Sequence, residues 1–350
     1  MNAAPVASGD LESARVANFV GRTYAVDGRA VELHIRPLHG GLEASGIARV
    51  DAHFRDSQGR ARASTFVVKQ LDGPARREAD LYGVLSGPAA TLAPRLLGVE
   101  AVSPERVYLY LEYVRATRVW PWRQLAPTGD VLKGLAAVHA NVADAATGTL
   151  LMSWDYEGEL RQRALWTLAM FEQASVTATV VSRLRSYGAA LRRLVLDLPR
   201  LRSELLAAAP FGSTVLHGDV HSRNVLLRVR QGAESPVLID WGRARIGSPL
   251  EDVSSWLHSL GCWEPEVRRR HDTLVQAYLA ARGFSTTLLP TVREAYWLAA
   301  ASNSLSGALG YQLWVAMDTT GRSERERLAA AAAVRHHLRV IRRADALWRA

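Results

Sequence analysis

Two carboxylates and one amide stand close to short apolar runs in residues 214–242. Asp219 comes shortly after the first run, Asn224 follows it by five positions, and Asp240 ends the last run. The turn residues at 232–236 predict a hairpin, which would bring the three side chains to one end of a small sheet. Oxygen ligands of this kind suit Mg²⁺, a hard cation that also retains phosphate oxygens. The segment therefore predicts a metal and phosphate site.

A second group of charged residues lies in the first third of the chain. Lys69 follows the apolar run 66–68 and is one of only two lysines in the sequence. The helix predicted over 74–85 begins near a proline and carries Glu78 and Asp80. A lysine on a strand is ordinarily an exposed edge charge, so its role depends on whether one of these carboxylates pairs with it.

The loop and metal segments also match a known pattern. Residues 217–224 read HGDVHSRN and residues 240–242 read DWG. They resemble the catalytic loop H-G-D-x-x-x-x-N and the metal motif D-x-G of the kinase-like phosphotransferases of the aminoglycoside phosphotransferase and choline kinase type. The resemblance extends over roughly residues 33–252. It implies an α+β, bilobal protein-kinase-like fold, with a small antiparallel-sheet N-lobe over 1–114 and a larger helical C-lobe over 115–350.

The resemblance also implies a role for each charged residue. Asp219 would orient the acceptor hydroxyl and accept its proton, and Asn224 and Asp240 would hold Mg²⁺. Lys69 would bind the α- and β-phosphates of ATP, aimed by an ion pair with Glu78. Asp80 remains a competing partner for the lysine, and GTP remains an alternative phosphate donor.

Two further segments resemble parts of the family's nucleotide site. Residues 38–46 contain glycines, which let backbone N–H groups approach phosphate oxygens, although the loop lacks the G-x-G-x-x-G pattern. Residues 110–114 resemble the hinge between the lobes, whose backbone would bond the adenine edge. A plain hairpin turn and an ordinary edge strand are the alternatives. The nucleotide-binding residues expected in these segments are Gly40, Gly41, Ser45, Gly46, Leu111, Glu112 and Val114.

Several residues near the motifs are expected to be structural. His217 would bond backbone near the metal motif, and Asp252 would start a helix and hold the catalytic loop. His221 would either order that loop or lie near the acceptor. His336 and His337 lie on an arginine-rich helical pattern, so they are expected to be exposed to solvent.

The apolar periodicity predicts a sheet-rich first third and a helical remainder. Strands are predicted over 30–36, 47–54, 63–71, 96–102 and 106–113, and helices over 11–20, 74–85, 130–142, 160–208 and from 250 nearly to 350.

Charge bears on the acceptor. The net charge of +9 lies entirely beyond residue 114, because 1–114 contain 13 basic and 13 acidic residues. Aminoglycosides are polycations that need acidic sites, so a basic C-lobe favours a neutral or anionic acceptor. The arginines expected near the acceptor are Arg183, Arg185, Arg192, Arg193, Arg200 and Arg202.

Composition excludes several classes of protein. A single cysteine rules out a disulfide framework, and no apolar run approaches the roughly 18 residues that a membrane span needs. The sequence lacks a secretory signal, nucleic-acid-binding motifs and a Walker A motif. We therefore expect a cytoplasmic protein with no membrane or nucleic-acid partner.

We thus expect an ATP-dependent O-phosphotransferase whose acceptor is a small molecule, in particular an antibiotic such as a nucleoside antibiotic. The short stretch between Asp240 and Pro249 is too small to dock a protein substrate. The alternatives are an aminoglycoside kinase, a kinase of a sugar or choline-like metabolite, and a nucleotide-binding protein without catalysis. Neither the acceptor nor the oligomeric state follows from the sequence.

Overall fold

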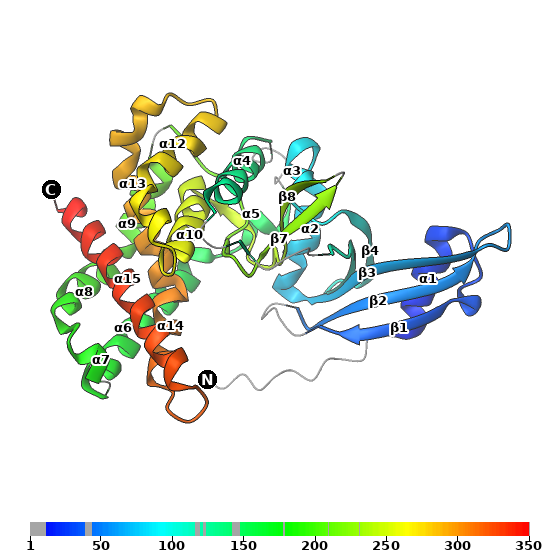
Figure 1. Ribbon diagram of the computed structural model, residues 1–350, viewed down its shortest axis with the longest axis horizontal. Helices are drawn as coiled ribbons and strands as arrows, with labels where there is room; N and C mark the ends of the chain where they lie inside the picture. Colours follow the sequence, from blue (N-terminus) through cyan, green and yellow to red (C-terminus); the bar gives the residue numbers. More distant parts are fainter. Residues whose placement is uncertain are drawn as a thin grey trace.

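The computed structural model describes residues 12–38, 44–115, 120–121, 124–141, 148–177, 179–208, 210–230 and 232–349. A sheet with a few helices forms one end of the molecule, and a larger helical body forms the other (Figure 1). The fold is therefore the predicted bilobal α+β class, whereas the boundary proposed at residue 114 remains a prediction.

The N-lobe is built on one antiparallel sheet with the strand order β1-β2-β3-β5-β4. All five predicted strands are present, with ends shifted by one or two residues. The turn between β2 and β3 closes with a 2.8 Å hydrogen bond from the Gly59 N–H to the Asp56 carbonyl. The strands are β1 (Glu32–Pro37), β2 (Gly46–Arg55), β3 (Ala61–Asp72), β4 (Leu96–Ser103) and β5 (Arg106–Glu112).

The two faces of this sheet are covered by different elements. Helix α1 (Ser13–Tyr24) covers one face, where the Phe19 ring stacks on Tyr110 with centroids 3.6 Å apart. Helices α2 (Arg77–Val84) and α3 (Gly87–Thr91) lie on the other side, toward the C-lobe. Because successive strand side chains point to opposite faces, Lys69 shares the C-lobe face with Leu71.

The C-lobe is helical, and the helical prediction over 160–208 is confirmed, although the stretch is divided rather than continuous. That stretch forms four helices, with Gly188 at the first position of one and Pro199 in the first turn of another, where a missing N–H is tolerated. The helices are α4 (Leu125–Asn141), α5 (Leu150–Ser153), α6 (Tyr156–Thr177), α7 (Thr179–Ser182), α8 (Gly188–Leu196), α9 (Leu198–Ala207), α10 (Pro249–Gly261), α11 (Pro265–Arg269), α12 (His271–Ala281), α13 (Leu289–Asn303), α14 (Leu309–Met317) and α15 (Glu324–Trp348).

Two small strand pairs lie between α9 and α10. Strand β7 (Val225–Arg230) pairs with β8 (Ala233–Leu238), which is the predicted hairpin. Strand β6 (Thr214–Leu216) pairs instead with β9 (Arg245–Gly247), a strand that the sequence did not predict. The catalytic-loop segment and the metal-motif segment are therefore tied together at both ends.

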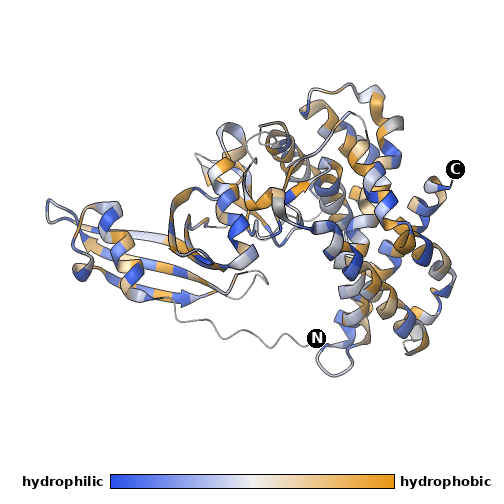
Figure 2. Cartoon of the chain, turned by 180° about the vertical axis from the view of Figure 1, so that it is seen from behind, coloured by the Kyte–Doolittle hydropathy of each residue, from blue (hydrophilic) through white to orange (hydrophobic). Residues whose placement is uncertain are grey.

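The core joins the two lobes. The largest cluster of buried apolar residues includes Leu71 and Leu109 of the sheet and Leu132 and Trp256 of the helices. Figure 2 shows apolar residues both in the helical body and along the strands of the sheet, where α1 packs, while the loop at the far end of the sheet is hydrophilic. None of the helices in the described part of the chain has the length and apolar character needed to cross a membrane.

The prediction that His336 and His337 are exposed is wrong. His337 is buried, with Nδ1 3.0 Å from the Ser304 hydroxyl, and His336 Nε2 lies 3.2 Å from His258 Nδ1. The arginines that suggested an exposed helix lie on the exposed side of α15. Because they outnumber the histidines, the composition of the helix did not indicate that the histidines face inward.

Candidate active site

Lys69 occupies a buried position between the sheet and the C-lobe. Strand β3 places it opposite Ile47 of β2 and Leu109 of β5, with its stem among apolar side chains. Its Nζ lies 2.8 Å from Glu78 Oε1 and 3.1 Å from Asp240 Oδ1. One ammonium therefore connects the sheet, helix α2 and the predicted metal motif.

The structure pairs Lys69 with Glu78 and gives Asp80 a different partner. The Asp80 carboxylate accepts the Leu150 N–H at 2.9 Å, on the opposite side of the helix from the lysine. Burial opposes the charge on Lys69, but the attraction of Glu78 and Asp240 outweighs it and raises the pKa of the ammonium. Lys69 is therefore a permanent cation at neutral pH.

The catalytic-loop segment begins at the end of β6, where His217 is fully buried. Its Nε2 lies 3.0 Å from the Ile239 carbonyl, and its Nδ1 accepts the Asp219 N–H at 3.2 Å. The first contact needs a proton on Nε2, and the second needs none on Nδ1. Burial lowers the pKa of His217, which favours this neutral imidazole. The ring thus links the loop to the residue preceding Asp240.

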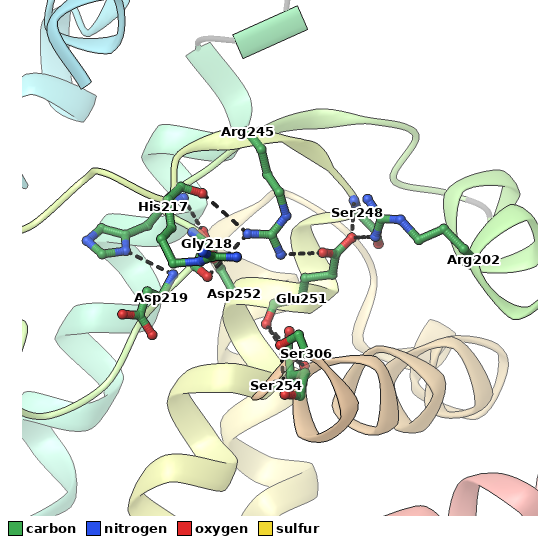
Figure 3. Close-up of polar contacts among 12 residues, drawn as sticks. Arg202, His217, Gly218, Asp219, Arg245, Ser248, Glu251, Asp252, Ser254 and Ser306 are labelled. Atoms are coloured by element: carbon green, nitrogen blue, oxygen red, sulfur yellow. Dashed lines mark hydrogen bonds and ion pairs between the residues drawn. The ribbon is translucent and has the colours of Figure 1, made fainter. Parts of the chain in front are cut away.

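Asp252, in the first turn of α10, holds the backbone of the same loop. Its carboxylate accepts the N–H groups of His217 at 2.7 Å and Gly218 at 2.8 Å (Figure 3). His139 Nε2 lies 3.3 Å from the same group. Burial would raise the pKa of Asp252, but His139, His217 and Arg245 lower it, so the carboxylate stays ionised.

Asp219 projects from this fixed backbone toward solvent, with 43% of its side chain exposed. Its Oδ2 lies 3.5 Å from His221 Nε2, whose other nitrogen accepts the Arg223 N–H. His221 thus makes contacts within the loop, one of the two roles considered for it. Partial burial raises the pKa of Asp219, but the neighbouring His221, His217 and Arg243 lower it. The group is a carboxylate at neutral pH.

Asn224 and Asp240 lie near this loop with oxygens suited to a hard cation. Asn224 donates through Nδ2 to the Asp219 carbonyl at 3.0 Å, which leaves its Oδ1 as an acceptor. Asp240 adopts φ +63°, a left-handed backbone that costs energy outside glycine and often occurs at functional sites. The described residues contain no group of three or more His, Cys, Asp or Glu able to hold a metal ion. Mg²⁺ needs no such group, since one or two protein oxygens suffice beside phosphates.

Of the predicted nucleotide loop 38–46, the structure describes residue 38 and residues 44–46. Gly40 and Gly41 lie outside the described residues. The Ser45 N–H donates to the Gln70 carbonyl at 3.0 Å, and Gly46 pairs with the same residue as β2 begins. This end of the loop therefore lies beside the strand that carries Lys69.

The expected hinge lies at the end of β5. Leu111 is buried in the core shared by the lobes, while the Glu112 carboxylate accepts an N–H of Arg228 at 2.7 Å. This contact joins the end of the sheet to β7. Within the described residues the Val114 N–H has no hydrogen-bond partner, although the residue is 7% exposed.

The sequence analysis did not identify the residues that hydrogen-bond to the backbone of the metal-motif segment. Arg77 Nε donates to the Gly242 carbonyl at 2.8 Å, and the Trp241 N–H donates to Glu78 at 3.3 Å. Arg245 and Glu251 form a second buried support on the other side. Arg77 directly precedes Glu78, but an arginine beside a glutamate is too common a pattern to signal this role.

The arginines expected near the acceptor are mostly engaged elsewhere. Arg202 is buried against Glu251, and only Arg183 of the six has no described contact here. The other contacts are Arg185 with the Ser175 carbonyl, Arg192 with Glu172, Arg193 with Asp345 and Arg200 over the Trp348 ring. Their positive charge is thus no guide to the acceptor.

Comparison with protein-family models matches residues 34–296 to the phosphotransferase enzyme family. That range contains the lysine, both motifs and helix α10. Comparison with curated proteins gives no match.

Solved structures with the same fold include several kinases. A choline kinase from Cryptosporidium parvum Iowa II matches with a TM-score of 0.58 and 12% identity, covering 95% of this chain and 96% of its own. A spectinomycin phosphotransferase in complex with ADP and spectinomycin matches with a TM-score of 0.53 and 14% identity, covering 95% and 98%. An ethanolamine kinase from Plasmodium vivax matches with a TM-score of 0.53 and 12% identity, covering 88% and 83%. At these identities the likeness concerns the fold.

Proposed function

The chain belongs to the phosphotransferase enzyme family, and on this premise we propose that it transfers the γ-phosphoryl group of ATP to a hydroxyl of a small molecule. The ADP named in the spectinomycin phosphotransferase structure supports an adenine nucleotide, with GTP as the alternative donor. The proposal includes Mg²⁺ and an antibiotic acceptor.

The observation that carries the proposal is the position of Lys69. Its buried ammonium bonds Glu78 and also lies 3.1 Å from Asp240. Burying a cation is costly unless it meets negative charge. A phosphate donor would bring that charge to the same position, between the nucleotide-binding strands and the metal motif.

Asp219 acts as the base in this mechanism. Its ionised carboxylate accepts the proton of the acceptor hydroxyl while orienting the oxygen toward the γ-phosphorus. The backbone on its N-terminal side is held by Asp252 and His217, so the carboxylate needs little reorganisation. Most of the rate enhancement then comes from positioning and electrostatics.

The phosphate groups are held by the remaining charged residues. Asn224 and Asp240 would hold Mg²⁺, which when bound neutralises charge on the phosphate oxygens. Lys69 binds the α- and β-phosphates, and Glu78 keeps the lysine directed toward them. The base would be contacted by Leu111, Glu112 and Val114. The phosphates would be contacted by the loop 38–46, with Gly40, Gly41, Ser45 and Gly46.

The short connection after the metal motif favours a small acceptor. Only residues 241–248 separate Asp240 from helix α10, and three of them form strand β9. Such a segment leaves no platform for an extended peptide. A compact acceptor reaching Asp219 directly fits this arrangement better.

Local charge favours a neutral or anionic acceptor, such as a nucleoside antibiotic. Arg243 is close enough to Asp219 to lower its pKa, and it bonds Glu159 at 3.0 Å. Arg163 bonds the same carboxylate at 2.6 Å. Arg243 therefore brings positive charge close to Asp219, which is less favourable for a polycationic aminoglycoside than a site lined with carboxylates alone.

The test is ADP release with ATP and Mg²⁺ against a panel of nucleoside antibiotics, aminoglycosides, peptide antibiotics, sugars and choline. We expect turnover with one neutral or anionic class. The D219A variant should lose at least about 100-fold in turnover, since a positioned base contributes that much. Its affinity for the nucleotide should remain nearly unchanged, because Asp219 contacts the acceptor.

Each other outcome points to a named alternative. Turnover with an aminoglycoside, a sugar or choline would keep the phosphotransferase but overturn the acceptor class. Nucleotide binding without ADP release on any acceptor would favour a non-catalytic nucleotide-binding protein. Near-wild-type turnover of D219A would remove Asp219 from the role of base.

A further inference from the structure

A buried guanidinium group lies directly behind the catalytic loop. Arg245, on β9, is 2% exposed, and its Nη1 donates to the Gly218 carbonyl at 3.2 Å (Figure 3). That carbonyl belongs to the peptide group that leads into Asp219. Arg245 Nη2 donates to Glu251 at 2.6 Å. The arginine thus joins the first turn of α10 to the residue before the catalytic carboxylate.

Glu251 is itself held from a second side. Its carboxylate is fully buried and also bonds the guanidinium of Arg202, which is 4% exposed. Both arginines contact the ring of Tyr156, Arg245 at 3.9 Å and Arg202 at 5.0 Å from the centroid. Two equally buried arginines therefore share one carboxylate and one aromatic ring.

Only one of the two arginines reaches the loop. Among the described residues, no hydrogen bond joins Arg202 to residues 217–224, whereas Arg245 bonds Gly218. Gly218 adopts φ +82°, and a side chain there would overlap Arg245 and the Arg243 carbonyl. The loop is packed so closely on the guanidinium that the position of one determines the position of the other.

Stability alone does not account for this arrangement. Buried ion pairs recover at most about their own desolvation cost, and apolar replacements of similar volume are often as stable. Within the described residues, Arg245 also leaves its Nε buried without a partner, and an unmet buried donor is destabilising. A destabilising arginine at this position is explained if its hydrogen bond to the Gly218 carbonyl serves the function of the loop.

We propose that Arg245, held by Glu251, is a positioning residue that fixes the Gly218 peptide and thereby the direction of the Asp219 carboxylate. Asp252 holds the two N–H groups of the loop, and Arg245 holds the carbonyl that follows them. Together they fix both sides of the Gly218 residue. The role in turnover rests on the proposed function, whereas the ordering of the loop does not.

The experiment compares R245M with R202M. Each variant removes one buried arginine from Glu251 and Tyr156, so both should lose thermal stability, but only R245M loses the bond to the loop. Hydrogen–deuterium exchange of the peptide covering 217–224 should accelerate at least tenfold in R245M and stay near wild type in R202M. Turnover per folded molecule should fall about 100-fold in R245M, the loss expected for a catalytic group misplaced by about 1 Å.

The R245K variant tests the same contact with a smaller expected effect on folding. R245K keeps a positive charge near Glu251 but replaces the planar fork with a single point of donation, so one of the two contacts is lost. We expect its melting temperature to remain close to that of wild type while kcat falls at least tenfold and KM for ATP changes little. Full kcat in R245K together with wild-type exchange in 217–224 would overturn the proposal.

The readouts separate this proposal from the proposed function. Equal acceleration of exchange in R245M and R202M, or none in either, would overturn the positioning role whatever the activity. Faster exchange in R245M alone, in a wild-type protein that transfers no phosphate to any acceptor, would retain Arg245 as the residue that orders the loop. That result would overturn the phosphotransfer reaction instead.

Discussion

At the scale of single residues, the site depends on charges held where water is scarce. Lys69 and Glu78 are both nearly inaccessible, with 6% and 1% of their side chains exposed. Because solvent screens such a pair poorly, removing one member leaves the other as an unpaired buried charge, which destabilises the folded protein. Asp219 differs, since its half-exposed side chain can be changed with little effect on folding.

The chain contains a matched control for the lysine. K69M should weaken binding of a fluorescent ATP analogue by about 10–100-fold, because a charge-assisted bond to phosphate contributes about 1.5–3 kcal/mol. K133M should leave binding unchanged, since Lys133 is 69% exposed and pairs with Asp130 on the surface. Equal affinity in the two variants would exclude Lys69 from the phosphate site.

At the scale of elements, helix α2 acts as a clamp on the metal motif. It contributes Arg77 to the Gly242 carbonyl and Glu78 to the Trp241 N–H. The Arg77 guanidinium also stacks over Trp154 at 3.6 Å, so the clamp extends to the start of α6. A movement of α2 would therefore shift Lys69 and Asp240 together.

Removal of this clamp should affect both stability and nucleotide use. R77M leaves the Gly242 carbonyl buried without its donor, which costs about 1–3 kcal/mol. We expect a lower melting temperature and a several-fold higher KM for ATP, measured by thermal unfolding and ADP release. R76M is the control, since Arg76 bonds the Pro104 carbonyl away from the motif. A variant that loses stability with an unchanged KM would limit the clamp to a structural role.

At the scale of the whole molecule, four helices enclose a histidine cluster in the C-lobe. His258 of α10 and His271 of α12 pack against each other and against Tyr296 and Trp297 of α13. On α15, the His336 ring lies beside His258, and His337 lies next to His336. Burial lowers the pKa of His271 and His337 to about 4 and that of His336 to about 3. The pKa of His258 is also lowered by burial and by the neighbouring histidines.

This cluster predicts acid instability in a defined range. Histidine in the unfolded chain titrates near pH 6.5. Below that pH the unfolded chain binds protons that the histidines of the folded cluster do not bind, because their pKa values are lower. Stability should therefore fall from pH 6.5 down to about 4, by on the order of 1–2 kcal/mol per histidine at pH 5. Urea unfolding at pH 7.5 and 5.0 measures the loss.

A pair of variants isolates the cluster from other titrating groups. H336F should reduce the loss of stability between pH 7.5 and 5.0, whatever its effect at pH 7.5. H34F should not, because His34 is 55% exposed on strand β1. An equal pH dependence in H336F and wild type would show that the cluster does not control acid unfolding.

Local pattern was enough to predict much of this protein. Strand and helix periods predicted the five-stranded N-lobe and the change to helix, because period-2 and period-3.6 patterns depend on near neighbours. The turn residues at 232–236 predicted the hairpin of β7 and β8, and the motif pattern predicted the family to which the chain belongs. The acceptor, the ends of the long helical stretch and strand β9 did not follow, since each depends on which distant surfaces meet.

The tertiary structure alone decided which charges are buried together. Asp80 and Glu78 are two positions apart on one helix, and only the packing of α2 against β3 assigns Glu78 to Lys69. Arg202, Arg245 and Glu251 come from α9, β9 and α10, and no local sequence pattern marks them as buried partners. The physical reason is that burial is a property of the assembled core, so a charge can acquire a buried partner without leaving a local pattern.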